Sequence, residues 1–190
     1  MREIGDIVRG EVFWYAVGCF YEWADGSLQD VGYFAHLGGL PEPLFRGVPG
    51  PAGAWFTFAA EPFRSIALPP NDRADTFTAS IDPPRRFSLY YSAEPVGDFA
   101  HPESFSRGLP IATFERATPV VGAATAAFAS NLFTARLVTS TPFEFAGQRF
   151  DLQAMLGFGV TQMGAAGAPF TPAAPGARSA RSFVGTAVRI

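Results

Sequence analysis

The chain has 190 residues, the size of one domain (1–190), and its net charge of −3 and pI of 5.4 argue against a nucleic-acid-binding protein, which needs a basic surface. The single cysteine, Cys19, excludes an intrachain disulfide. The first residues lack the pattern of a signal peptide, and no apolar run is long enough to span a membrane. We therefore expect a cytoplasmic protein with no membrane partner.

Aromatic and β-branched runs between turn residues predict short strands. The first two, residues 11–23 and 28–37, flank Ala24-Asp25-Gly26-Ser27, and Asp-Gly is a favoured two-residue hairpin turn. Both runs exceed the usual strand length, so we expect a bulge or bend, at Gly18 or Gly32. Alternating apolar side chains predict further strands over residues 54–60, 75–81, 85–92, 110–116, 131–139 and 182–190.

Three later segments are less regular. Residues 117–130 fit a helix by their alanines and a strand by their valines and threonines. A short hairpin around Ala146-Gly147 is predicted within Phe143 to Phe150, and a short helix is predicted within residues 151–158. Residues 157–162 are interpreted as a turn. Residues 163–180 are rich in Gly, Ala and Pro and predict a long loop that could act as a lid.

About eight short antiparallel strands in one domain predict an all-β fold, an up-and-down barrel, with a two-sheet sandwich as the alternative. The 20 phenylalanines are roughly two to three times ordinary usage. So much aromatic surface requires a large core, a ligand cavity or a subunit interface.

The first hairpin supplies the candidate site. With Asp25 and Gly26 as its turn, Tyr15 faces His36 and Tyr21 faces Asp30, with all four on one face of the sheet. If that face lines a barrel lumen, Tyr15 and His36 could exchange a proton with a substrate and are the candidate catalytic pair. The same face adds candidate ligand-binding residues, which are Cys19, Tyr21, Asp30 and Phe34. A purely structural Tyr–His pair is the alternative, and a bulge would break the register.

Two later strands extend the candidate cavity. Phe56 and Phe58 share one face of their strand and would serve as core or as cavity wall, and Tyr91 shares a face with Phe87 and Leu89. The chain has only two histidines and one cysteine, with no metal-binding spacing and no phosphate-binding loop or nucleophile elbow. We therefore expect no metal and no cofactor.

The sequence is compatible with two functions. The first is the binding of an apolar or aromatic small molecule in a barrel cavity, or its cofactor-free conversion by an isomerase, cyclase or lyase type of reaction. The second is a non-enzymatic homo-oligomeric assembly protein with a filled interior, in which Trp14, Phe20 and Tyr33 pack against a second subunit. Cavity volume discriminates between them, because a closely packed interior leaves no room for a ligand.

Overall fold

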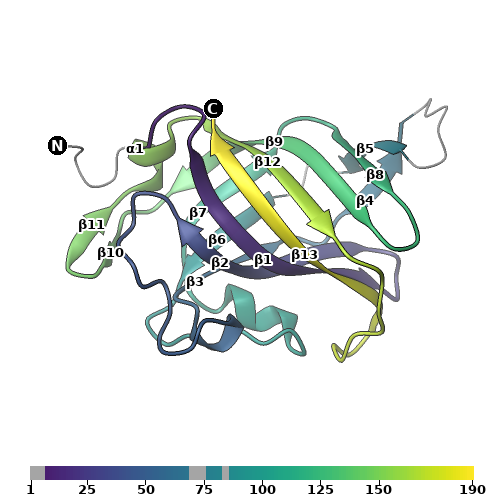
Figure 1. Cartoon of the computed structure of the whole chain (residues 1–190), viewed down its shortest axis with the longest axis horizontal. Coiled ribbons are helices and arrows are strands. Elements are labelled where there is room, and N and C mark those ends of the chain that lie inside the picture. The colour runs from purple at the N-terminus through teal and green to yellow at the C-terminus, as the bar shows by residue number, and fades with distance from the viewer. Residues whose placement is uncertain (1–6, 69–75, 83–85) are drawn as a thin grey trace.

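A computed structural model of the chain describes residues 7–68, 76–82 and 86–190. These residues are mainly strands, joined by one short α-helix and two 3-10 turns (Figure 1). The strands are β1 Val12–Trp23, β2 Leu28–Leu37, β3 Phe56–Ala60, β4 Arg64–Ala67, β5 Thr76–Asp82, β6 Arg86–Tyr91, β7 Leu109–Arg116, β8 Val120–Ala124, β9 Ala129–Ser140, β10 Phe143–Phe145, β11 Gln148–Phe150, β12 Gly159–Ala166 and β13 Ala177–Arg189. The helix is α1 Leu152–Leu156, and the 3-10 turns are η1 Pro51–Gly53 and η2 Pro102–Ser106.

Eight of the strands form a closed antiparallel barrel, which confirms the predicted fold. Around the barrel the order is β1, β2, β3, β6, β7, β9, β12 and β13, and pairing of β12 with β9 closes the circle. This order follows the chain, as in an up-and-down barrel. β7 and β8 pair with successive halves of the same edge of β9, and β8 continues through β5 to β4 as an extension beyond the barrel.

The first hairpin forms, but its turn has three residues instead of two. The Trp23 amide donates to the Ser27 carbonyl, and Gly26 adopts φ 79°, a conformation that glycine allows without strain. The predicted register is therefore wrong over most of the hairpin, because Tyr21 pairs with Gln29 and Phe20 with Asp30. The one register shift lies between Tyr15 and Ala16.

Gly18 and Gly32 have a different role from the bulge predicted there. They lie opposite each other, and a Cβ on Gly18 would stand 2.5 Å from the Phe183 ring, while one on Gly32 would stand 2.7 Å from the Phe58 ring. Absence of side chains at this pair leaves room for the two rings, whose centroids are 6.1 Å apart. The glycines thus allow aromatic packing inside the barrel.

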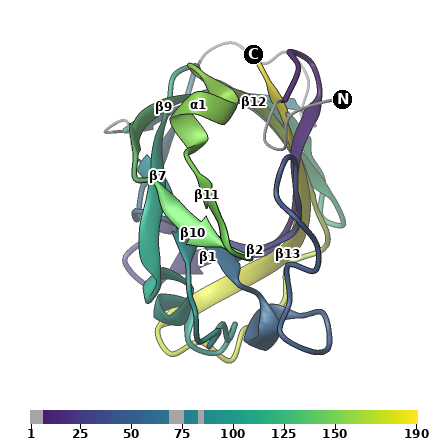
Figure 2. The same cartoon turned by 90° about the vertical axis from the view of Figure 1, so that its left-hand side faces the viewer.

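One end of the lumen is closed and packed with aromatic rings. The β10–β11 hairpin and α1 lie across this end (Figure 2). The hairpin places Phe143 and Phe145 5.7 and 4.9 Å from Phe56 between ring centroids. Deeper in the lumen Trp14 packs against Phe114, with their ring centroids 5.7 Å apart. We call this part of the barrel the closed end.

Two segments differ from the sequence-based expectation, and a third that fitted both helix and strand is now assigned. Residues 163–180 are not one long loop, because β12 extends to Ala166 and β13 begins at Ala177. The start of β12 replaces the turn expected over residues 157–162, and β8 makes part of the ambiguous segment 117–130 a strand. These glycine- and alanine-rich strands lack the large alternating side chains that indicate a strand, and their pairing partners come from elsewhere in the chain.

A candidate ligand cavity at the open end of the barrel

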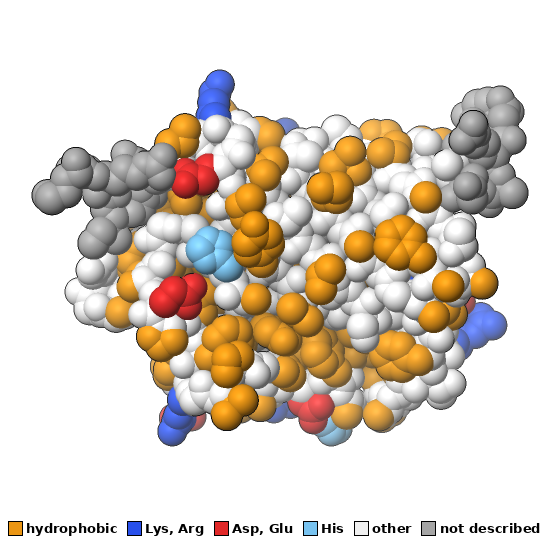
Figure 3. Space-filling view, viewed as in Figure 1, with side chains coloured by type: hydrophobic (Ala, Val, Ile, Leu, Met, Phe, Trp, Pro, Cys, Tyr) orange, Lys and Arg blue, Asp and Glu red, His pale blue; other side chains and the backbone are white. Residues whose placement is uncertain are grey.

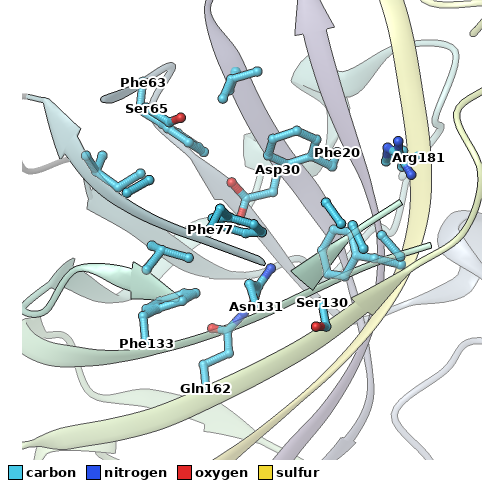
Figure 4. Close-up of a pocket in the computed structure, with 18 of the residues that line it drawn as sticks. Phe20, Asp30, Phe63, Ser65, Phe77, Ser130, Asn131, Phe133, Gln162 and Arg181 are labelled. Atoms are coloured by element: carbon cyan, nitrogen blue, oxygen red, sulfur yellow. The ribbon is translucent and has the colours of Figure 1, made fainter. Parts of the chain in front are cut away.

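The lumen contains a cavity of about 250 Å³ at the end opposite β10, β11 and α1, partly open to solvent. Its apolar wall comes mostly from aromatic rings, among them Phe20, Phe63, Phe77 and Phe133 (Figure 4). Ile81 and Phe183 also line it. Its polar side chains are Asp30, Ser65, Arg116, Ser130, Asn131, Gln162 and Arg181. Apolar walls with a few polar groups are typical of small-molecule sites.

Small residues on the lumen face make the cavity. Ala129 of β9 pairs with Ala166 of β12, and both line the space. Gly122 of β8 gives room to the Phe77 ring, which would lie 2.8 Å from a Cβ at that position. The extension of the sheet through β8, β5 and β4 therefore supplies one wall of the cavity, while β9 and β12 supply another.

A buried ion pair forms part of the cavity wall. The Nη2 atom of Arg116 donates to both carboxylate oxygens of Asp30, at 3.0 and 3.1 Å. The Arg116 side chain is 4% exposed and that of Asp30 is 15% exposed. Because each charge is removed from water, each depends on the other for compensation.

Aromatic rings surround the Arg116 guanidinium. Its central carbon lies 4.5 Å from the centroid of Phe63, 5.3 Å from that of Phe133 and 5.7 Å from that of Phe87. Guanidinium groups are attracted to the faces of such rings. The rings and Asp30 together hold the guanidinium in one place, and its Nη1 atom takes no part in the ion pair.

Three lumen side chains have unused hydrogen-bonding capacity. The Nη1 atom of Arg116 and the Oδ1 atom of Asn131 are buried and have no hydrogen-bond partner among the described residues. The Gln162 side chain also makes no hydrogen bond within that part of the chain, and Asp30, Asn131 and Gln162 extend into the same space (Figure 4). Buried polar groups are nearly always paired, so unpaired ones in a cavity indicate a place for a ligand group or water.

The cavity floor separates it from the packed lumen. Asp30, Gln162 and Phe183 also line a void of about 10 Å³ beside Trp14 and Phe34. A void of that size holds about one water molecule. Below this layer the lumen is filled, so a ligand would end at the level of the ion pair.

Arg181 lies at the partly exposed edge of the cavity. It is on β13, next to Phe20 of β1, which in turn pairs with Asp30 of β2. Its Nη1 atom donates to the Gly167 carbonyl, and it has no carboxylate partner in the described part of the chain. Because the charges of Asp30 and Arg116 cancel, Arg181 gives the described lining residues a net charge of +1.

Of the predicted ligand-binding residues, Asp30 lines the cavity. Phe34 and Phe58 lie just below it, at the small void under the floor. Phe56 and Tyr91 face the lumen as expected but pack at the closed end, with ring centroids 5.3 Å apart. They are core residues there, because the β10–β11 hairpin covers them.

Tyr15 and His36 are neighbours but do not line the cavity. They pair across β1 and β2 with ring centroids 5.8 Å apart, and Tyr15 is 51% exposed on the outer surface. The His36 Nδ1 atom lies 3.7 Å from the Glu42 carboxylate, also on the outside. The expectation that they face the lumen is therefore wrong, because the inward residues of β1 are Trp14, Ala16 and Phe20. Their catalytic role stays a prediction without support from the cavity.

Cys19 and Tyr21 also face outward, beneath a second layer. Both are buried against Phe105 of η2 and Ala174 of the β12–β13 connection. The Tyr21 hydroxyl donates to the Phe99 carbonyl at 2.7 Å. Burial raises the pKa of the Cys19 thiol, with a partial offset from the neighbouring Tyr21 side chain, and burial is also the main cause that raises the pKa of Tyr21. The expectation that this face of β1 lines the lumen is therefore wrong.

Sequence reasoning missed Arg116, Asn131 and Gln162. Arg116 ends β7, where an arginine ordinarily marks the exposed end of a strand, and Asn131 and Gln162 lie in segments with weak alternation. An available signal was the phase of β9, because Asn131, Phe133 and Ala135 alternate on one face. An asparagine in phase with core residues is a buried polar group that needs a partner.

The outer face of β1, β13, β12 and β9 has several exposed apolar side chains. Tyr15 pairs with Thr186, Thr186 with Met163, and Met163 with Leu132, which makes one row across four strands. Val184 lies beside this row and is 59% exposed. Apolar and uncharged atoms cover most of this face, with charged side chains at its margins (Figure 3).

The fold and the cavity define an eight-stranded β-barrel with a partly open, mainly apolar lumen site. Comparison of the chain with protein-family models, curated proteins and solved structures finds no match. Over residues 7–68, 76–82 and 86–190, no group of three or more His, Cys, Asp or Glu side chains could hold a metal ion. None of the helices in these ranges has the length and apolar character needed to cross a membrane.

Proposed function

We propose that this protein binds an apolar or aromatic small molecule in the open end of its barrel. The observation that carries the proposal is a cavity of about 250 Å³ in a lumen that is otherwise packed with aromatic rings. A barrel that only needed a core could fill this space by replacing Ala129 and Ala166 with larger side chains.

The cavity volume sets the size of the ligand. An apolar cavity of about 150 Å³ in a protein core can take up benzene. The larger space here suits a molecule of one or two rings, or a short branched chain, with contacts to Phe20, Phe77 and Phe133. A much larger ligand would extend past Arg181 into solvent.

The cavity suits binding better than turnover. A general acid or base needs a titratable group within reach of the ligand, with a pKa near the working pH. The titratable lining residues are Asp30, Arg116 and Arg181, and both oxygens of Asp30 accept hydrogen bonds from Arg116. Cofactor-free conversion of the bound molecule therefore stays a prediction, with Asp30 as the group that would carry it.

Native mass spectrometry of the purified protein, followed by denaturing extraction, tests the proposal first. We expect a small molecule to be bound to the purified protein. If the protein is purified empty, we expect calorimetry to show that it binds added naphthalene with a stoichiometry of one molecule per chain. Ala166→Leu, which fills the cavity, should weaken naphthalene binding at least tenfold, whereas Ala123→Leu on the outer face should leave it unchanged. Equal affinities in the two variants would contradict binding in the lumen.

A non-enzymatic assembly protein is the second candidate, favoured by the exposed row of Tyr15, Met163 and Leu132. A subunit contact through Trp14 and Phe20, as the sequence predicts, is wrong because these side chains face the lumen. Uncharged, partly apolar faces without a covering layer often mark contacts between proteins. The same mass spectrum reports the oligomeric state, and a defined oligomer without naphthalene uptake would favour this candidate.

A further inference from the structure

The geometry points to a ligand with an uncharged polar group, a hydroxyl or a carbonyl, at the end that enters the lumen first. This inference rests on the proposed function and specifies the class of molecule. It depends on Arg116, Asn131 and Gln162 at the inner end of the cavity, each with hydrogen-bonding capacity that no described residue uses.

The unpaired atoms are complementary to such a group. The buried Nη1 atom of Arg116 is a donor, and Asn131 and Gln162 each offer an amide with both a donor and an acceptor. A hydroxyl can accept from one of these groups and donate to another, and a carbonyl can accept from two. The ligand would thereby satisfy groups that otherwise cost free energy in the empty lumen.

The ion pair selects against a negative charge at this depth. Asp30 already accepts two hydrogen bonds from Arg116, so the pair presents no net charge to the ligand. A ligand carboxylate near Arg116 would also lie near the carboxylate of Asp30 and would lose its own hydration. A neutral polar group avoids both costs.

The aromatic cage fixes the position of the donor. Phe63 and Phe133 stand 4.5 and 5.3 Å from the Arg116 guanidinium, and Asp30 holds its Nη2 atom. The guanidinium cannot turn toward solvent without leaving these contacts. A ligand must therefore bring its polar group to the inner end, with its apolar body among Phe20, Phe77 and Phe183.

Three probes of equal ring size test the inference, namely naphthalene, 2-naphthol and 2-naphthoate, with affinities measured by calorimetry at pH 7. We expect 2-naphthol to bind about tenfold more tightly than naphthalene, the effect of one net hydrogen bond to a charged group. We expect 2-naphthoate to bind at least tenfold more weakly than 2-naphthol. No binding of any probe would defeat the proposed function itself, whereas equal binding of all three would defeat only this inference.

Variants assign the selectivity to the inner end. Asn131→Leu and Gln162→Leu should each reduce the advantage of 2-naphthol over naphthalene to less than threefold. Gln148→Leu, at an exposed position of β11 outside the cavity, should preserve that advantage. Because loss of Arg116 alone would leave Asp30 unpaired, the double variant Asp30→Leu/Arg116→Met is used, with Arg107→Gln as a surface control. The double variant should keep naphthalene binding and lose the 2-naphthol preference.

One outcome would reverse the inference. If 2-naphthoate binds most tightly and Arg181→Gln removes that preference, the polar group of the ligand is an anion held at the edge of the cavity. A retained 2-naphthol preference in the Asp30→Leu/Arg116→Met variant would likewise overturn the role of the inner end.

Discussion

The two ends of this barrel use the same strand alternation for opposite purposes. At the closed end, large side chains such as Trp14, Phe56 and Phe114 face the lumen, and the β10–β11 hairpin adds Phe143 and Phe145. At the open end, β8, β9 and β12 direct alanines, glycines and amides inward and leave a cavity of about 250 Å³. The size of the inward residues, and not the strand pattern, decides which part of a barrel is core and which is a site.

This contrast separates stability from binding. The closed end removes large aromatic side chains such as Trp14, Phe56 and Phe114 from water, which stabilises the fold through the hydrophobic effect. The open end holds a buried ion pair and unpaired amides, which contribute little to stability or oppose it. This division predicts that truncating an aromatic side chain lowers the free energy of unfolding more at the closed end and weakens ligand binding more at the open end.

The largest expected effect is at the closed end. Trp14→Ala should lower the free energy of unfolding by about 4 kcal/mol, because Trp14 is 2% exposed and packs against Phe34, Phe87 and Phe114. Phe77→Ala, in the cavity wall, should cost about 1 kcal/mol, because its ring borders empty space and is partly exposed. Urea denaturation measures the free energy of unfolding of both variants.

Binding should show the reverse order. Phe77→Ala removes part of the cavity wall and should weaken naphthalene binding several-fold, whereas a folded closed-end variant at a residue away from the cavity floor should bind nearly normally. Leu89→Ala is a milder closed-end substitution for that comparison if Trp14→Ala does not fold. Equal stability losses at the two ends would show that the cavity wall is part of the core.

Much of the fold was predictable from local pattern. The strands rich in large alternating residues were anticipated, and Phe87, Leu89 and Tyr91 do share the inward face of β6. β4, β8 and β12 were missed or left ambiguous because Arg64–Ala67, Val120–Ala124 and Gly159–Ala166 carry little aromatic alternation. Their place is set by pairing with neighbouring strands, which local composition does not encode.

The site was less predictable for two physical reasons. A turn of three residues instead of two shifted the register by one, so Asp30 shares the inward face with Phe20 and not the outward face that carries Cys19 and Tyr21. In addition, Arg116 and Asp30 are 86 residues apart and meet only when the barrel closes. Contacts between strands that are distant in the sequence can be predicted only once the order of all the strands in the barrel is known.

The next prediction concerns the ion pair at the open end. Asp30→Leu leaves the Arg116 charge buried without a partner and should lower the free energy of unfolding by about 3 kcal/mol, at the lower end of the usual range because Asp30 is partly exposed. Asp30→Leu/Arg116→Met replaces the pair with apolar groups and should lie within about 1 kcal/mol of the unchanged protein. Urea denaturation of both variants measures the difference. A double variant as unstable as the single one would mean that the pair is a net contributor to the core, and the contrast between the two ends would weaken.

The smallest predicted effect is a loss of stability at alkaline pH. It arises outside the lumen, at the covered outer side of β1 that carries Cys19 and Tyr21. Burial raises the pKa of the Cys19 thiol, so the folded protein resists its ionisation, while the unfolded chain ionises near the ordinary value of about 8.5. Stability is therefore fully present below about pH 8 and falls as the pH rises, by at most about 1.4 kcal/mol per pH unit for one proton. Tyr21, whose pKa is also raised, adds to the loss above about pH 10. Urea denaturation in reductant from pH 7 to 10 should show this decline, and Cys19→Ala should remove most of the decline below pH 10. An unchanged decline in that variant would assign the alkaline sensitivity to another region of the barrel.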